Sequence, residues 1–225
     1  MQSIVTIAAP VATVRLTTLD RVKQELNIDD NRKNAILQTK IDEASSDIQA
    51  AMGYRLPSED VTETFWHDSP QYLGYHSSPL YGRADSTIIF LKRTPVSKIT
   101  SVTVDDDVLD PTEYRFDEGA GLLYRIDGSG YPCHWWFGKS VVVVYTAGFI
   151  LPGESGRNLE PAIEGAVVAL VSSYWFNKGR NGMVKSENIP GVRQVEYWVG
   201  AVGDPELLPP RVLASIAQFR RPAAA

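Results

Sequence analysis

Histidine and cysteine are the residue types most often found at metal and catalytic sites, and this chain of 225 residues has three histidines and one cysteine. His67, His76 and His134 lie far apart in the sequence, and only His134 neighbours Cys133. A zinc site needs paired ligands at short spacings, and adjacent residues of a strand point to opposite faces. We therefore expect no metal, no cofactor and no catalytic residue, and we predict that the protein is not an enzyme.

Acidic residues and glycines gather in short segments that could in principle hold calcium or phosphate. Asp105–Asp107, Asp110 and Asp127 lack the glycine and the terminal glutamate of a calcium-binding loop. Gly119–Gly121 and Gly128–Gly130 are not followed by the helix that a phosphate-binding loop requires. These segments are predicted to be turns.

The densest aromatic segment runs from residue 131 to 137. One hypothesis is a platform on which bases or sugars stack. The alternative is a core patch or a contact between subunits, which we favour because only one basic residue, Lys139, lies close by. The residues of this candidate contact patch are Tyr131, Trp135, Trp136 and Phe137.

The overall composition is that of an ordinary folded protein, with 44% hydrophobic and 22% charged residues. The net charge of −5 argues against a protein whose main task is to grip nucleic acid, because that task needs a concentrated basic surface. Residues 1–14 lack the pattern of a signal peptide, and the longest apolar runs are too short to cross a bilayer. We expect a soluble protein with no membrane partner.

Helical patterns occupy both ends of the chain. Thr18 predicts the N-cap of a short helix, and residues 31–52 predict a longer one that ends at Gly53. Pro161 suits the first position of a largely apolar helix, and Pro209 and Pro210 begin a short last one. Because each pair of helices has apolar faces without a partner, we expect the two pairs to pack together as a small bundle.

The middle of the chain changes to the short alternating patterns of strands, separated by Gly and Asp turns. The predicted strands are Val61–His67, Thr87–Leu91, Ile99–Val104, Tyr114–Asp117, Leu122–Arg125 and Ser140–Tyr145. The sequence thus predicts an α+β protein in which an antiparallel β module, residues 57–150, is inserted into a helical domain. That domain would comprise residues 17–56 and 151–225, preceded by an extended N-terminal arm or edge strand at residues 1–16.

Several segments resemble, in the same order along the chain, those of the head–tail connector (adaptor or head completion) proteins of tailed bacteriophages. They are residues 19–29 (LDRVKQELNID), 41–48, 93–102 (RTPVSKITSV), 143–152, 161–163, 185–191 and 213–220. Each segment is weakly specific, and the resemblance lies in their order. The arm at 1–16 is longer than the family pattern, and residues 131–137 have no counterpart in it.

The resemblance implies a structural virion protein of the phage neck, made in the host cytoplasm. In that family, commonly twelve copies form a ring below the portal protein and extend the DNA channel. DNA passes through the channel during packaging and ejection without specific binding. The ring also presents a surface to the next neck or tail protein.

Two segments acquire candidate roles from this resemblance. C-terminal segments of the family often dock into the portal, and the matching residues are Phe219, Arg220, Arg221 and Pro222. A loop at 178–193 is basic within an acidic protein and is either solvated, in contact with a neighbouring subunit, or part of the channel lining. Its basic residues are Lys178, Arg180, Lys185 and Arg193.

Two other classes of function stay open. One is a carbohydrate- or nucleic-acid-binding module that uses the aromatic β insert. The other is a hydrolase built from scattered Asp and Glu residues, which would show a deep pocket of converging carboxylates.

Overall fold

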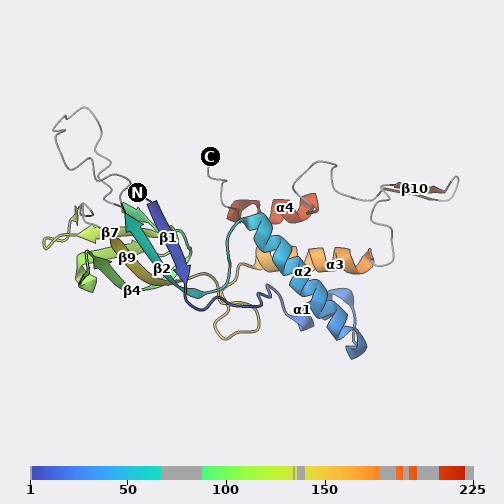
Figure 1. Cartoon of the computed structure of the whole chain (residues 1–225). Helices are drawn as coiled ribbons and strands as arrows, with labels where there is room; N and C mark the ends of the chain where they lie inside the picture. Colours follow the sequence, from blue (N-terminus) through green and yellow to red (C-terminus); the bar gives the residue numbers. More distant parts are fainter. Residues whose placement is uncertain are drawn as a thin grey trace. The chain divides into compact units, whose positions relative to one another are not determined.

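A computed structural model describes residues 2–66, 88–133, 135, 140–177, 186–189, 193–196 and 208–220 (Figure 1). The chain divides into two compact units, one of Met1–Val11 with Pro57–Phe149 and one of Ala12–Leu56 with Ile150–Ala225. We call them the β unit and the helical unit. Antiparallel sheets build the first and helices dominate the second, which confirms the predicted α+β class.

The first sheet of the β unit has five antiparallel strands in the order β1-β2-β9-β4-β5. They are β1 (Gln2–Ile7), β2 (Glu59–Trp66), β9 (Val141–Ala147), β4 (Val96–Val104) and β5 (Asp107–Val108). Within the segment expected to be an N-terminal arm, residues 2–7 therefore form an edge strand. Two register shifts interrupt the pairing of β4 with β9, whereas β1 pairs continuously with β2.

The second sheet has β7 between β3 and β6, and the short β8 also pairs with β7. The strands are β3 (Ile88–Phe90), β6 (Tyr114–Asp117), β7 (Leu122–Ile126) and β8 (Pro132–Cys133), and a 3-10 turn, η3 (Pro111–Glu113), precedes β6. Side chains of both sheets share one buried core. The six strands predicted from alternation are confirmed as β2, β3, β4, β6, β7 and β9. The two-residue strands β5 and β8 are too short to give a pattern.

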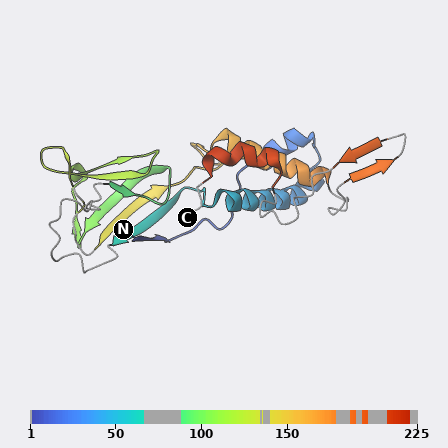
Figure 2. The ribbon, with the colours of Figure 1, turned by 90° about the horizontal axis from the view of Figure 1, so that it is seen from above.

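The helical unit contains the predicted helices at both ends of the chain. They are α1 (Leu19–Leu26), α2 (Asn34–Met52), α3 (Pro161–Phe176) and α4 (Pro210–Ile216), with short 3-10 turns η1 (Asn31–Lys33) and η4 (Ala217–Phe219). Thr18 caps α1 by accepting from the Arg21 amide, and Gly53 ends α2 with a φ of 77°. The apolar helix α3 contacts α1, α2 and α4, so it forms the centre of this unit (Figure 2).

A separate hairpin also belongs to the helical unit. It consists of β10 (Ser186–Ile189) and β11 (Arg193–Glu196), which pair antiparallel with each other. Sequence analysis treats residues 178–193 as a loop and does not predict β10. Among the described residues, no helix combines the length and the apolar character that crossing a bilayer requires.

Candidate functional site

The strand β2 carries two carboxylates into the core of the β unit. Along β2 the buried positions alternate with less buried ones, and Glu59 and Glu63 occupy buried positions together with Val61 and Phe65. The exposed fractions are 4% for Glu59 and 0% for Glu63. Burying a charged group is unfavourable unless partners compensate it, so the partners of these carboxylates decide what the site can do.

Three donors from different parts of the chain surround the Glu63 carboxylate. Its Oε1 accepts a hydrogen bond from Ser3 Oγ at 2.5 Å. Its Oε2 accepts from Tyr145 Oη at 2.8 Å and from the Lys92 backbone amide at 3.0 Å. Glu63 therefore ties β1, β9 and the segment after β3 to β2.

The Glu59 carboxylate is paired with Arg93. Glu59 Oε2 lies 3.1 Å from Arg93 Nη1, and Glu59 Oε1 accepts from the Val11 amide at 2.8 Å. Arg93 Nη2 donates to the Pro57 carbonyl at 3.0 Å, and the Arg93 amide donates to Tyr145 Oη at 3.3 Å. We call Glu59, Glu63, Arg93 and Tyr145 the buried polar network.

The buried polar network has a structural role, because its hydrogen bonds hold distant segments of the β unit together. Burial and the neighbouring Glu63 carboxylate raise the pKa of the Tyr145 hydroxyl, so the hydroxyl keeps its proton and donates a hydrogen bond to Glu63. Both carboxylates accept from donors that the fold fixes in place, and each accepts from one backbone amide. The network thus anchors the N-terminal segment and the turn before β4 instead of presenting a reactive group.

Sequence analysis does not identify this network, although β2 contains a usable signal. Glu59 and Glu63 occur at the same alternating positions as Val61 and Phe65, so an amphipathic strand would have to bury them. Arg93, the partner of Glu59, lies in a different part of the chain, and nothing in its local sequence marks it as buried. The role of buried glutamates in a strand can be interpreted only when the residues that compensate their charge are known.

The prediction that the chain has no metal site depends on three histidines and one cysteine, and the structure describes only the cysteine. His67, His76 and His134 are outside the described residues, and Cys133 is half-buried and free. Within the described ranges, no three His, Cys, Asp or Glu side chains are grouped so that they could hold a metal ion.

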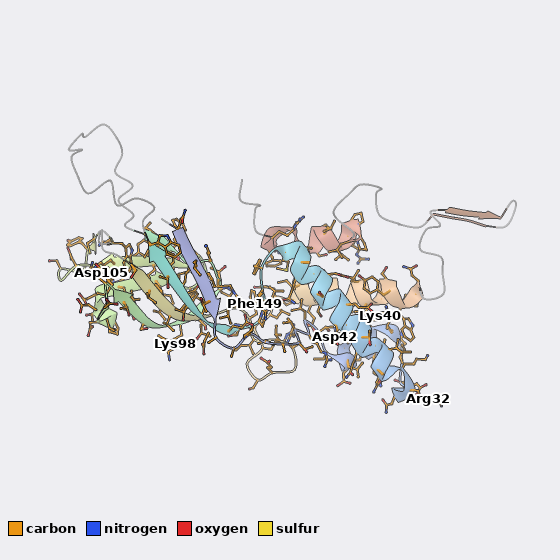
Figure 3. All side chains as sticks on the ribbon, viewed as in Figure 1. Arg32, Lys40, Asp42, Lys98, Asp105 and Phe149 are labelled. Carbon is orange, nitrogen blue, oxygen red and sulfur yellow. The ribbon has the colours of Figure 1, made fainter. Side chains whose placement is uncertain are left out.

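The acidic segments form turns, as predicted. Asp105, labelled in Figure 3, has a φ of 49° and Asp106 a φ of 74°. The Asp105 carboxylate accepts from the Ser140 amide at 3.0 Å. Asp127 accepts from the amides of Ser129 and Tyr131 at 2.9 and 3.0 Å. The Asp127 carboxylate therefore stabilises its own turn, whereas the Asp105 carboxylate binds its turn to Ser140, just before β9.

Two cavities in the described parts of the two units have no acidic residue in their lining. One, of about 660 Å³, lies in the β unit. It is lined by Gln2, Ser3, Ile4, Phe65, Trp66, Ile88, Ile89, Phe90 and Lys92. The other, of about 340 Å³, lies between α3 and α4 and is lined mainly by small residues. Neither cavity is the pocket of converging carboxylates that a hydrolase would need.

The structure separates the two described members of the candidate aromatic patch. Trp135 is 2% exposed in the core of the β unit, and its Nε1 donates to the Leu123 carbonyl at 3.3 Å. Tyr131 is 70% exposed, and Trp136 and Phe137 lie outside the described residues. Trp135 thus has a core position, whereas Tyr131 is available at the surface.

The candidate loop and tail are described only in part. Lys178, Arg180 and Lys185 lie outside the described residues, and Arg193 begins β11 opposite Ile189.

In the tail, Phe219 is half-buried at the end of η4 and Arg220 is exposed, with its Nε donating to the Ala51 carbonyl at 3.0 Å. Arg221 and Pro222 lie outside the described residues.

Aromatic residues at the end of α3 join it to α2, which sequence analysis does not predict. Lys40, labelled on α2 in Figure 3, lies 5.7 Å from the ring centre of Tyr174, and Lys33 lies 5.5 Å from that of Trp175. Tyr174 Oη donates to Asp47 at 2.6 Å. Next to this contact, Phe176 is 76% exposed.

One family model matches part of the chain. Residues 16–72 match the family model of phage gp6-like head-tail connector proteins. This range contains α1, α2 and β2. No curated protein matches the chain significantly.

Comparison with solved structures covers almost the whole chain. A chain in the neck of an empty gene transfer agent (GTA) particle, with C6 symmetry, is 16% identical with a TM-score of 0.52. A chain in the neck of a native GTA particle, with C12 symmetry, is 15% identical with a TM-score of 0.51. A third, from the virion of a native GTA particle, is 14% identical with a TM-score of 0.53. Each match covers 99% of this chain and 97% of the other. Residues 16–72 are thus similar to the phage gp6-like head-tail connector family, and the fold of the whole chain is similar to that of a chain in the neck of a GTA particle.

Proposed function

We propose that this chain is a structural subunit of the neck of a tailed phage or phage-like particle, where it connects the head to the tail. The observation that carries the proposal is the fold match over 99% of the chain to a protein in the neck of a GTA particle. The connector family match at residues 16–72 points to the same role independently.

The proposed assembly is a ring of identical copies, twelve in number, below the portal protein. The similar chains come from necks with C12 and C6 symmetry, which supports a cyclic arrangement. The ring extends the DNA channel and offers a surface to the next neck or tail protein. DNA passes without specific binding, in keeping with a net charge of −5.

Within this proposal the helical unit is the connector domain and the β unit is an insertion in it. The family match begins at residue 16, shortly before α1, and continues through α2. Tyr131, exposed on the β unit, belongs with Trp136 and Phe137 to a surface for subunit contact.

The C-terminal tail is proposed to dock into the portal through Phe219, Arg220, Arg221 and Pro222. A chain truncated after Arg220 keeps the contact of Arg220 with the Ala51 carbonyl, so it should fold normally. We expect this truncated chain to lose binding to portal rings, as measured by co-sedimentation. Unchanged binding would refute the docking role of Arg221 and Pro222.

The loop with Lys178, Arg180, Lys185 and Arg193 is proposed to contact a neighbouring subunit or to line the channel. The double variant Lys178→Glu/Arg180→Glu should therefore impair ring formation or the retention of DNA in assembled particles. If particles carrying this variant assemble and retain DNA normally, the loop is a solvated connection and no more.

The alternative, a module that binds carbohydrate or nucleic acid through the aromatic segment, has less support. Trp135 is in the core with its indole N–H bonded, so it cannot serve as a stacking platform.

One experiment tests the proposal as a whole. The purified chain is measured alone by native mass spectrometry and then, mixed with portal rings, by cryo-electron microscopy. We expect rings of the chain on one face of the portal. Absence of any ring with portal present would contradict the proposed function.

A further inference from the structure

The strand β1 forms one edge of the first sheet of the β unit. In the order β1-β2-β9-β4-β5, β1 is terminal and pairs only with β2 among the described strands. Its six residues, Gln2–Ile7, contain no charge, no proline and no register shift. Natural proteins usually protect an edge with such features, because a long, flat and uncharged edge accepts another strand.

The opposite edge of the same sheet carries that protection. β5 has only two residues, and it follows Asp105 and Asp106, which both have positive φ. The neighbouring β4 has two register shifts and contains Lys98. The contrast marks β1, and not the sheet in general, as an acceptor.

The buried polar network and its neighbours hold β1 in place. Glu63 accepts from Ser3 Oγ, Glu59 accepts from the Val11 amide, and Lys92 Nζ donates to the Ser3 carbonyl at 2.6 Å. Because Lys92 engages the chain at Ser3, the stretch Ile4–Ile7 is the part of the edge free of this lysine. Ile4 is 59% exposed, and Val5 and Ile7 are only partly buried at the margin of the core.

A matching donor is present in the helical unit. The hairpin β10–β11 pairs with itself and packs extensively on no other described element. A two-stranded hairpin alone in water is only marginally stable, so it gains most from joining a larger sheet. Each of its strands has four residues, as many as the stretch Ile4–Ile7.

We infer that the β10–β11 hairpin of one copy adds to the edge of β1 in a second copy, so that neighbouring subunits are joined by strand addition. This inference rests on the proposed ring. Backbone hydrogen bonds along Ile4–Ile7 supply the contact, and the anchored β1 loses little further conformational freedom on binding.

Cross-linking between copies in assembled rings tests the inference. In a Cys133→Ser background, copies with Thr6→Cys are mixed with tagged copies that carry Asn188→Cys or Gln194→Cys, one on each hairpin strand. Rings are formed on portal and then mildly oxidised. We expect disulfide-linked heterodimers with one of the two hairpin positions. The matched control is Val108→Cys, which is 70% exposed on β5 and should give none.

A charge at the edge gives a second readout. Ile4→Lys should leave the monomer folded but raise the concentration needed for ring formation about tenfold, whereas Val108→Lys should not. Rings that form without a Thr6 cross-link, or with wild-type concentration dependence for Ile4→Lys, overturn the inference and leave the proposed function standing. If no ring forms with the unmodified chain, both fail.

Discussion

At the scale of single residues, the β unit depends on charges that are buried and mutually compensated. Arg93 and Glu59 form an ion pair whose side chains are 6% and 0% exposed. Such a pair is a weak source of net stability, but removing one partner leaves an uncompensated charge in the core. Arg93 Nε is buried and has no hydrogen-bond partner among the described residues. The guanidinium group therefore does not use all of its donors in the folded protein.

Arg93→Met should therefore destabilise the β unit by about 3–5 kcal/mol. Hydrogen exchange of the β2 and β9 amides measures the effect in the β unit alone. Arg93→Met combined with Glu59→Gln should recover part of the loss, because the orphaned carboxylate is neutralised. As a control, Arg15→Met breaks the exposed pair with Asp42 and should change little. Equal effects of Arg93→Met and Arg15→Met would contradict the role given to burial.

Tyr145 predicts a dependence of stability on alkaline pH. In the unfolded chain its hydroxyl ionises near pH 10, whereas in the folded protein burial and Glu63 raise its pKa above that value. Unfolding above about pH 10 thus releases a proton, and the free energy of unfolding falls as the pH rises. Tyr145→Phe should lower the stability at neutral pH by about 1–3 kcal/mol and flatten this fall.

The control for Tyr145 is Tyr174, which titrates in the other unit. Burial and the hydrogen bond to Asp47 raise the pKa of Tyr174. Tyr174→Phe should change the alkaline response of the α2 and α3 amides and leave β2 unaffected. If Tyr145→Phe keeps the full slope of the β unit, the hydroxyl is not the titrating group.

At the scale of elements, the helical unit is held together by the apolar faces of its helices, and α2 packs against α3. Leu37 belongs to the buried residues of α2. Leu37 and Ile36 are adjacent in the sequence, yet Leu37 is 0% exposed and Ile36 is 40% exposed. Successive residues of a helix are turned by about 100° from each other, so one can enter the core while its neighbour stays outside.

Leu37→Ala should cost about 2–5 kcal/mol of stability, because it removes buried apolar contacts and leaves a cavity. Ile36→Ala, which removes a similar volume at an exposed position, should cost much less. Chemical denaturation, monitored by hydrogen exchange of the helical amides, distinguishes Leu37→Ala from Ile36→Ala. Since each unit has its own core, the β2 amides should keep their protection in both variants.

At the scale of the whole molecule, the net charge distinguishes the proposed passive channel from a protein that binds DNA. The chain has 22 basic and 27 acidic residues. A surface of this balance repels a polyanion in general, so the proposed ring of such copies would let DNA slide past instead of holding it.

The isolated chain should therefore show no retardation of duplex DNA in a gel-shift assay at about 10 μM protein and about 150 mM salt. A shift that weakens steeply as salt increases would reveal a basic surface and contradict the proposed passive channel. The variant Lys178→Glu/Arg180→Glu, measured in parallel, would show whether that surface is the loop.

The sequence by itself determined what depends on neighbours along the chain. Thr18, Gly53 and Pro161 mark helix ends, since a cap acts within one turn. Alternation located the six longer strands for the same reason. The α+β class and the ordered family resemblance followed from these local signals.

Only the tertiary structure decided what depends on contacts between distant segments. Glu59 and Arg93 are 34 positions apart, Ser3 and Glu63 are 60 apart, and Tyr145 and Glu63 are 82 apart. No local pattern encodes such pairings, because alternation along a strand can indicate that Glu59 or Glu63 is buried but not which distant residue is its partner. The same holds for β1, whose residues suit an arm or a strand equally well until β2 is placed beside it.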